Sequence, residues 1–250
     1  GVGPGSRRLE DKHAPFARKA QHIIVARFGG SLVRGVRADR CTAQKAAHAG
    51  HVNSSACPRW RTYDNRVTPT LAGYGIALRP LSPADAAVLQ PGIDPDFWRG
   101  MTVPVPATVA DLAAQFADAA ATPGRESFAV VGGDGRVVGT TSFYDVTDHR
   151  LEIGHTFYLR QAWGTRVNPA AKMLLLTEAF ERRRLDRVAL RCDARNARSR
   201  AAIQKLGAVY EGTLRAHRRA SDGVVSDTSY YSIIAAEWPA VKSGLLARLG

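Results

Sequence analysis

Cysteine and long apolar runs are both scarce in this chain. Its 250 residues include three cysteines, too few for the disulfide framework of a small secreted domain, which favours a reducing compartment. No apolar run reaches the length of a membrane span. The most apolar N-terminal segment, residues 23–33, is interrupted by Arg27 and lacks a cleavage site typical of secretory leaders. These absences predict a cytoplasmic protein without a membrane partner.

Acidic residues are scarce in the first quarter of the chain. The net charge is +13, and residues 1–66 contain 13 of the 35 basic residues but only four of the 22 acidic ones. They show neither helical nor strand periodicity, which predicts disordered or poorly packed chain. Weak contact with nucleic acid or an anionic surface is a second interpretation, although interleaved aromatic residues are lacking. The third is a zinc site, but the spacing is not a common finger pattern and we expect no metal; the candidate ligands are Cys41, His48, His51 and Cys57.

The start of the chain carries a further hypothesis. No methionine precedes Met101, and residues 67–81 resemble the beginning of a domain. We therefore expect residues 1–66 to be an N-terminal extension upstream of a natural start at Val67, and residues 67–250 to form one domain. The intact mass of the protein from its native host tests this expectation.

Regular patterns begin after residue 74. Residues 75–81 alternate apolar and polar side chains, which predicts a strand. Ser82, with Asp85 three residues later, is typical of a capping box at the start of a helix that runs to Leu89. The other elements expected before residue 150 are a helix over 108–121 and two strands within 127–146, joined by a hairpin turn at Asp134 and Gly135.

Residues 151–200 carry the most informative pattern. An alternating segment precedes a polar loop and a long amphipathic helix, and a second alternating segment leads into another helix. Within the loop, Asn168 suits the helix N-cap and Pro169 the first helical position, since proline has no N–H to leave unpaired. The N–H groups and positive dipole at such a helix start bind anions such as phosphate. The run Arg182–Arg184 suits the other, negative end of this dipole, and we expect it to be a solvated helix terminus.

The last part of the chain completes the predicted architecture. Asn196 is expected to cap a helix that Gly207 closes. A final hairpin turns at residues 221–223, and a short amphipathic helix follows Pro239. The order of helices and strands implies a central mixed sheet with helices on both faces.

Several separated motifs agree with one known family. Gln161-x-x-Gly164 lies between a predicted strand and a predicted helix, and another predicted helix starts at Asn196. With the segments 163–181, 193–219 and 230–245, these motifs resemble the GCN5-related N-acetyltransferases (GNAT). Within that superfamily they resemble the RimJ and RimL branch, which acetylates N-terminal amines of ribosomal proteins. The resemblance covers roughly residues 70–250.

The resemblance implies an α/β fold with a mixed, mostly antiparallel sheet and a notch where two strands splay apart to receive acyl-CoA. The implied acyl donor is acetyl-CoA, with its pantetheine on the first of these strands and its pyrophosphate at the following loop. Two positions depart from the family pattern: Arg166 replaces the usual second glycine of the loop, and Ile203 stands where many relatives carry a tyrosine acid. Asn196 would both cap its helix and face the donor. The residues implied to hold acetyl-CoA are Phe157, Tyr158, Leu159, Trp163, Gly164, Thr165, Arg166, Val167, Asn168, Asn196, Ser199 and Arg200.

Transfer from a thioester to an amine needs a held donor, a neutral amine and a route for the amine proton, but no nucleophilic residue. Glu152 lies on the opposite strand parity to Leu151 and Ile153. We therefore expect it to leave the core, face the acceptor and act as the base, directly or through water. An exposed or ion-paired strand residue is the alternative. His155 shares the apolar parity, which favours a packed core histidine unless a bulge re-aims it.

The proline-rich segment 92–106 is expected to lack regular structure. Trp98 and Met101 within it are candidates for binding the acceptor, because binding residues concentrate on loops. A local apolar cluster that pins the loop is the alternative.

These observations predict an acetyl-CoA-dependent N-acetyltransferase that acts on a primary amine. The amine is either the N-terminal amine of a protein, such as a ribosomal protein, or that of a small molecule. The alternative is a catalytically silent acyl-CoA-binding or RNA-associated module that uses the basic residues 1–66. The sequence leaves the acceptor, the acyl-chain length and the oligomeric state open, a homodimer included.

Overall fold

The computed structural model describes residues 27–28, 31–32, 68–98 and 100–250. The chain divides after Arg59 into two units, and each is described by itself. In the first, the short strands β1 (Arg27–Phe28) and β2 (Ser31–Leu32) pair antiparallel. The zinc ligands, the nucleic-acid contact and the start at Val67 fall outside the described side chains, and the boundary at residue 66 stays a prediction.

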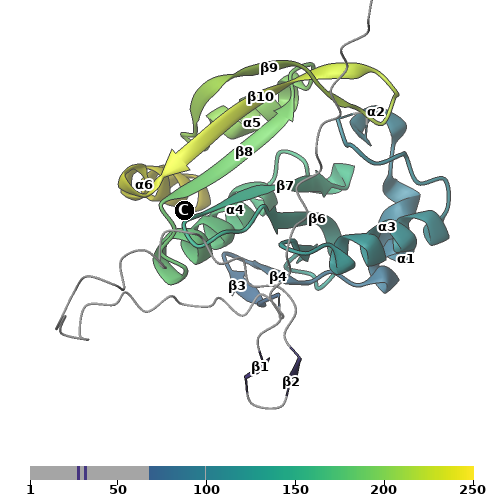
Figure 1. The fold of residues 1–250 in the computed structure, drawn as a ribbon, viewed down its shortest axis with the longest axis horizontal. Coiled ribbons are helices and arrows are strands. Elements are labelled where there is room, and N and C mark those ends of the chain that lie inside the picture. Colours follow the sequence, from purple (N-terminus) through teal and green to yellow (C-terminus); the bar gives the residue numbers. More distant parts are fainter. Residues whose placement is uncertain (1–26, 29–30, 33–67, 99) are drawn as a thin grey trace, which may run out of the picture. The chain divides into compact units, whose positions relative to one another are not determined.

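Eight strands of the second unit form one sheet in the order β3-β4-β5-β6-β7-β8-β10-β9 (Figure 1). Neighbouring strands are antiparallel except β7 and β8, which are parallel. The expected mixed, mostly antiparallel sheet is therefore confirmed. Its strands are β3 (Leu71–Gly73), β4 (Ile76–Pro80), β5 (Glu126–Val131), β6 (Val137–Tyr144), β7 (Arg150–Tyr158), β8 (Arg187–Asp193), β9 (Val209–Arg219) and β10 (Val225–Ile234).

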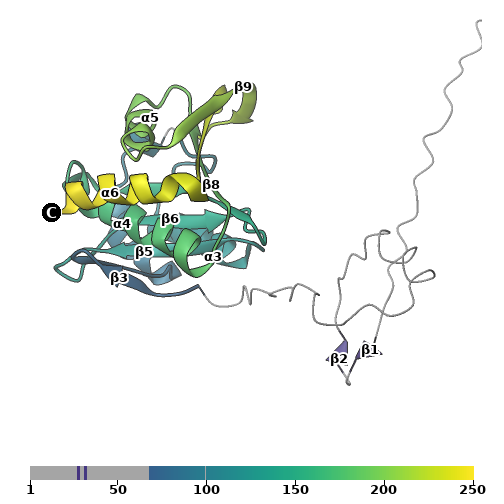
Figure 2. The ribbon, with the colours of Figure 1, turned by 90° about the vertical axis from the view of Figure 1, so that its left-hand side faces the viewer.

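Helices cover both faces of this sheet (Figure 2). α4 packs against α6 and against β3 and β4, whereas α1 contacts β6 and α3 contacts β5. Among the described helices, none combines the length and the apolar composition needed to cross a membrane. The helices are α1 (Ala86–Leu89), α2 (Pro95–Trp98), α3 (Val109–Ala121), α4 (Val167–Thr177), α5 (Ala197–Gln204) and α6 (Trp238–Leu249).

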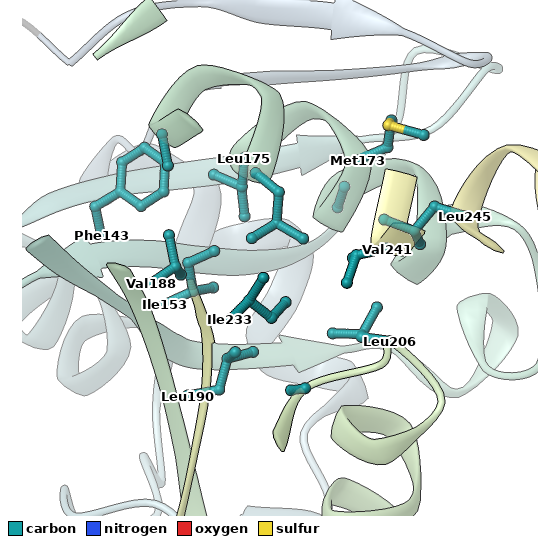
Figure 3. Packing of buried hydrophobic residues seen from close by; sticks show 14 of the residues in the cluster. Phe143, Ile153, Met173, Leu175, Val188, Leu190, Leu206, Ile233, Val241 and Leu245 are labelled. Carbon is teal, nitrogen blue, oxygen red and sulfur yellow. The ribbon is translucent and has the colours of Figure 1, made fainter. Parts of the chain in front are cut away.

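Two apolar clusters hold these layers together. The larger joins the sheet to α4 and α6 (Figure 3), and the smaller joins it to α1 and α3. Phe128 and Val130 of β5 belong to the larger cluster, while Ala129 between them belongs to the smaller. Successive side chains of a strand point to opposite faces, so a strand covered on both faces is buried along most of its length.

The helix start at Ser82 and the first hairpin agree with the sequence prediction. The Ser82 hydroxyl accepts from the N–H of Ala84, and the Asp85 carboxylate accepts from the N–H of Ser82, which completes the capping box. Gly135 has φ of +79° in the turn between β5 and β6. This left-handed conformation favours glycine. The hairpin prediction is thus confirmed.

The start of α4 differs from the prediction. The helix begins at Val167 with Arg166 at the N-cap, not with Asn168 there. The Thr165 hydroxyl accepts from the N–H of Val167 at 3.2 Å and so takes the capping role. Pro169 is therefore the third helical residue, where its missing N–H still removes no intrahelical bond; the first such bond runs from Ala170 to the Arg166 carbonyl oxygen.

The sequence predicted that the arginine run at the end of α4 is a solvated helix terminus. The structure differs, because one of these arginines is buried. The side chain of Arg183 is only 2% exposed and pairs with Glu126 at 2.6 Å and Glu178 at 3.1 Å. A π-helical turn over Glu178–Arg182 continues α4 and precedes this residue. The neighbouring Arg182 keeps 70% of its side chain exposed. Arg183 is therefore a buried link between the end of α4 and β5.

Gly139 of β6 lies where β6 and β7 approach closely. A Cβ there would lie 2.3 Å from the carbonyl oxygen of Phe157 and 3.0 Å from the Cα of Tyr158, so the backbone of β7 would have to move. We expect Gly139→Ala to lower the free energy of unfolding by roughly 2–3 kcal/mol, as overpacking does, measured by urea denaturation. Gly244→Ala in α6 is the control, because a Cβ there meets nothing within 4 Å. Equal losses in the two variants would contradict the prediction.

Candidate active site

Strands β7 and β8 pair over only part of their length. Their parallel register joins Arg150–Ile153 to Arg187–Leu190. Beyond it, β7 continues beside β6, and β8 continues beside β10 (Figure 1). A cavity of about 320 Å³ opens between the two strand ends, and Tyr158 and Cys192 are among its lining residues. The expected notch between splayed strands is present, and no strand of the described residues pairs with this edge of β7 there.

A bulge in β7 turns His155 toward this cavity. The register shifts between Thr140 and Ser142 of β6, and His155 has φ of +47°. The strand parity predicted a packed core histidine unless a bulge of this kind re-aimed the side chain. The imidazole lines the cavity and lies edge-on to the ring of Tyr144, with 5.2 Å between ring centroids. Burial, together with the nearby positive charges of Arg125, Arg191 and Arg218, lowers the pKa of His155 to about 4, so the ring is neutral at pH 7.

Glu152 was expected to face the acceptor, but it is not among the residues that line the cavity. The residue is 3% exposed, and its carboxylate accepts a hydrogen bond from the Tyr144 hydroxyl and lies 2.9 Å from Nε of Arg191. The alternative of an ion-paired strand residue describes its surroundings correctly. Parity misled because β7 is buried on both faces here: Leu151 and Ile153 pack in the larger core cluster, and Glu152 on the other face is enclosed with Tyr144 and Arg191. Burial raises the pKa of Glu152. Tyr144 lines the cavity, so its hydrogen bond to Glu152 connects that carboxylate to the cavity.

The strand residues expected to hold the donor divide into two groups. Phe157 and Tyr158 line the cavity, whereas Leu159 packs into the smaller core cluster. The Tyr158 hydroxyl is buried and has no hydrogen-bond partner among the described residues. The indole of Trp163, which also lines the cavity, donates to the Tyr158 carbonyl oxygen at 2.7 Å.

The loop before α4 contributes fewer residues than expected. Gly164 and Asn168 line the cavity, but Thr165, Arg166 and Val167 do not. Thr165 donates to the carbonyl oxygen of Ala162 at 2.8 Å. The Arg166 guanidinium donates to the Gly250 carbonyl oxygen at 2.7 Å. These two side chains thus contact the protein itself, and they brace the loop.

Helix α5 supplies the opposite wall. Asn196 accepts from the N–H of Ser199 at 2.9 Å, so the predicted cap is confirmed, and both residues line the cavity. Arg200 does not line it. Arg198, which the sequence analysis missed, does, and its guanidinium stacks 3.7 Å from the centre of the Trp163 ring.

Lys172 is a second residue that the sequence analysis missed. It is 6% exposed on α4, lines the cavity, and donates to the Thr156 hydroxyl at 3.3 Å. Burial lowers its pKa to about 8. A lone lysine inside the apolar run of residues 170–176 was the signal that could have identified it, because such a position faces the core.

The proline-rich segment is more regular than expected. It contains α2, and a 3-10 turn over Gln90–Gly92 leads into it. Trp98 is 1% exposed and its indole donates to the Val103 carbonyl oxygen at 3.0 Å, so it pins the loop, as the alternative interpretation had it. Met101 lines both the main cavity and a smaller one of about 40 Å³ beside it.

Comparisons with known proteins agree with this geometry. A family model described as "Acetyltransferase (GNAT) domain" matches residues 76–209. A Bacillus subtilis (strain 168) protein with the provisional name ribosomal N-acetyltransferase YdaF is 32% identical over 111 residues, which are 44% of this chain and 60% of that protein. The chain thus spans less than two thirds of this curated relative.

Solved structures show the same fold. An acetyltransferase from T. thermophilus, also named provisionally, is 38% identical with a TM-score of 0.69, and the match covers 72% of this chain and 97% of that one. Mycobacterium smegmatis RimJ in complex with CoA-disulfide shares the fold at 24% identity and a TM-score of 0.62, over 73% of this chain and 96% of that one. Because the family match spans more than half of its residues, the chain belongs to the GNAT acetyltransferase family.

Proposed function

We propose that the protein is an acetyl-CoA-dependent N-acetyltransferase that transfers an acetyl group directly to a primary amine. The proposed acceptor is the N-terminal amine of a protein, such as a ribosomal protein, or a small-molecule amine, and the proposed place of action is the cytoplasm. The observation that carries the proposal is the cavity between the splayed ends of β7 and β8, beside the start of α4. The name of the B. subtilis relative and the CoA-disulfide in M. smegmatis RimJ support the acceptor and the donor.

The residues present fit such a donor. The unpaired edge of β7 offers backbone groups to an extended amide chain, and the buried Tyr158 hydroxyl has no partner in the part of the chain that the structure describes. Asn168, at the positive end of α4, and Arg198 favour the donor's phosphates. Bound there, acetyl-CoA would supply an already activated acyl group.

The chain's own residues would then handle the acceptor amine. An N-terminal amine has a pKa of roughly 7.7–8.0, so a large share is neutral near physiological pH. We propose that the Tyr144 hydroxyl accepts the amine proton as it passes its own to Glu152. The hydrogen bond from Tyr144 to Glu152 already exists. The raised pKa of Glu152 suits a carboxylate to that task.

One observation favours the alternative of a catalytically silent acyl-CoA-binding module. Ile203 lines the cavity and cannot donate a proton to a leaving thiolate. Release of CoA thiol that requires an added amine would reject the silent module. Donor binding without such release would favour it. An RNA-associated role rests on residues 1–66 and gains no support from the described side chains.

Donor binding is tested by thermal unfolding of the full chain with and without acetyl-CoA. A ligand that binds only the folded state adds about 2.7 kcal/mol at a hundredfold excess over its Kd, so we expect a higher midpoint. Asn196→Ala should lose both a helix cap, costing roughly 1 kcal/mol, and much of the shift caused by acetyl-CoA. Thr108→Ala is the matched control, because Thr108 caps α3 by accepting from the N–H of Asp111 and does not line the cavity. It should lose stability but keep the shift, and no shift in the parent protein would refute donor binding.

A further inference from the structure

His155 lies where the two cavities meet. It lines both the main cavity and the smaller one of about 40 Å³. The smaller space is large enough for a few water molecules or a group of a few atoms. A substrate that reaches His155 from the main cavity can therefore place a small side group in the adjoining one.

Arg125 is one of the residues that line the smaller cavity. Its guanidinium donates to the hydroxyl of Ser127 at 3.1 Å and to that of Ser142 at 3.4 Å. No acidic side chain of the described residues pairs with it. Two neutral hydroxyls leave part of its hydrogen-bonding capacity and all of its charge unanswered.

Arg218 of β9 lines the main cavity and, like Arg125, has no ion-pair partner among the described residues. One terminal nitrogen donates to the Gly100 carbonyl oxygen at 3.0 Å, which ties β9 to the segment before Met101. Its Nε is buried, and no described residue forms a hydrogen bond with it. Within the described part of the chain, Arg218 too has no carboxylate beside it.

The walls of the two cavities have an excess of positive charge. Among the described residues, Asp193 is the one acidic residue that lines these cavities. Its carboxylate already pairs with Arg195 at 2.8 Å and accepts a hydrogen bond from the Ser226 hydroxyl. The positive charge of Arg191 is balanced by the carboxylate of Glu152, which forms an ion pair with it. Five cationic side chains line the two cavities: Arg125, Lys172, Arg191, Arg198 and Arg218.

We infer that the acceptor carries a carboxylate a few bonds from the amine that is acetylated, and that Arg125 and Arg218 bind it. This inference rests on the proposed function. A guanidinium that is partly removed from water is stabilised strongly by a carboxylate, which can accept two parallel hydrogen bonds from it. The same charges repel polyamines and other cationic acceptors. Arg198 of α5 is the cation proposed above to favour the donor's phosphates, and Lys172 of α4 donates to the Thr156 hydroxyl.

The test is a panel of acceptors for the full chain with acetyl-CoA, with kcat/KM measured from released CoA thiol. Three C-terminally amidated tetrapeptides begin with serine and differ at the second residue, which is aspartate, asparagine or lysine. Free glutamate and glutamine amide, which has no carboxylate, form a second pair, which separates a peptide from a small-molecule source of the carboxylate. We expect the acidic member of each active set to be preferred by roughly 10- to 100-fold, as a hydrogen bond to a charged group predicts.

Variants then locate the preference. Arg125→Gln and Arg218→Gln should each reduce the acidic-to-neutral ratio by about tenfold. Arg136→Gln, which removes one charge from the exposed β5–β6 turn, should leave the ratio unchanged. Because a ratio is compared within one protein, partial unfolding does not mimic the effect, and the ratio in the parent protein tests the inference without any variant.

Two results would overturn the inference, and they differ in what they leave standing. Equal or faster turnover of the neutral and lysine-containing acceptors refutes the carboxylate but keeps the N-acetyltransferase. Failure of every acceptor, the acidic ones included, refutes both.

Discussion

Arg183→Ala is expected to lower the free energy of unfolding by about 3–5 kcal/mol, the usual cost of removing one partner from a buried ion pair. The substitution would leave the carboxylates of Glu126 and Glu178, which are 3% and 7% exposed, without their guanidinium. It would also remove the contact of that guanidinium with the ring of Phe143, 4.8 Å away. Since a whole domain is stable by only about 5–15 kcal/mol, the loss should be visible as a large fall in the urea midpoint.

The neighbouring arginine provides the control for Arg183. Arg182 also lies near Glu178, at 3.8 Å, but is 70% exposed, so Arg182→Ala should cost no more than about 0.5 kcal/mol. Adding Glu126→Gln to Arg183→Ala should restore part of the stability, because one uncompensated buried charge disappears. Similar losses of stability in Arg183→Ala and Arg182→Ala would show that burial does not determine how much the ion pair contributes to stability.

Local chemistry explains why much of the fold could be predicted from the sequence. The Ser82 and Asp85 capping box, the turn at Gly135 and the Asn196 cap each depend on a few neighbouring residues. The order of such elements, with the family resemblance, was enough to predict the sheet. The predicted cap at Asn168 was wrong, because the Thr165 hydroxyl can accept a hydrogen bond from the start of α4 as an asparagine side chain would. The sequence does not decide between two possible capping residues three positions apart.

Tertiary contacts explain what the sequence did not reveal. Arg183 looked solvated because its partner Glu126 lies on a strand 57 residues away. Glu152 looked exposed because alternation cannot indicate that both faces of a strand are covered. His155 faces the cavity only because of a bulge, whose presence depends on the pairing of β6 with β7.

Glu152→Gln is expected to reduce kcat by roughly 10²- to 10⁴-fold if Glu152 receives the acceptor proton through Tyr144. Glutamine keeps the shape of the side chain and an oxygen that can accept from the Tyr144 hydroxyl, but it cannot take up a proton at neutral pH. Tyr144→Phe should reduce kcat as well, because it interrupts the path while leaving Glu152 beside Arg191. Glu211→Gln is the matched control: Glu211 of β9 also pairs with a strand arginine, Arg187 of β8 at 2.5 Å, but does not line either cavity.

The pH dependence of kcat separates Glu152 from His155 as the base. A base works in its deprotonated form, so activity falls as the pH drops through its pKa. Burial raises the pKa of Glu152, which places this fall above the usual range of a carboxyl group, whereas His155 would place it near its own pKa of about 4. The higher fall should disappear in Glu152→Gln. If kcat and its fall are unchanged in that variant, Glu152 is not the base, and a fall near pH 4 that His155→Gln abolishes would assign the proton transfer to the imidazole.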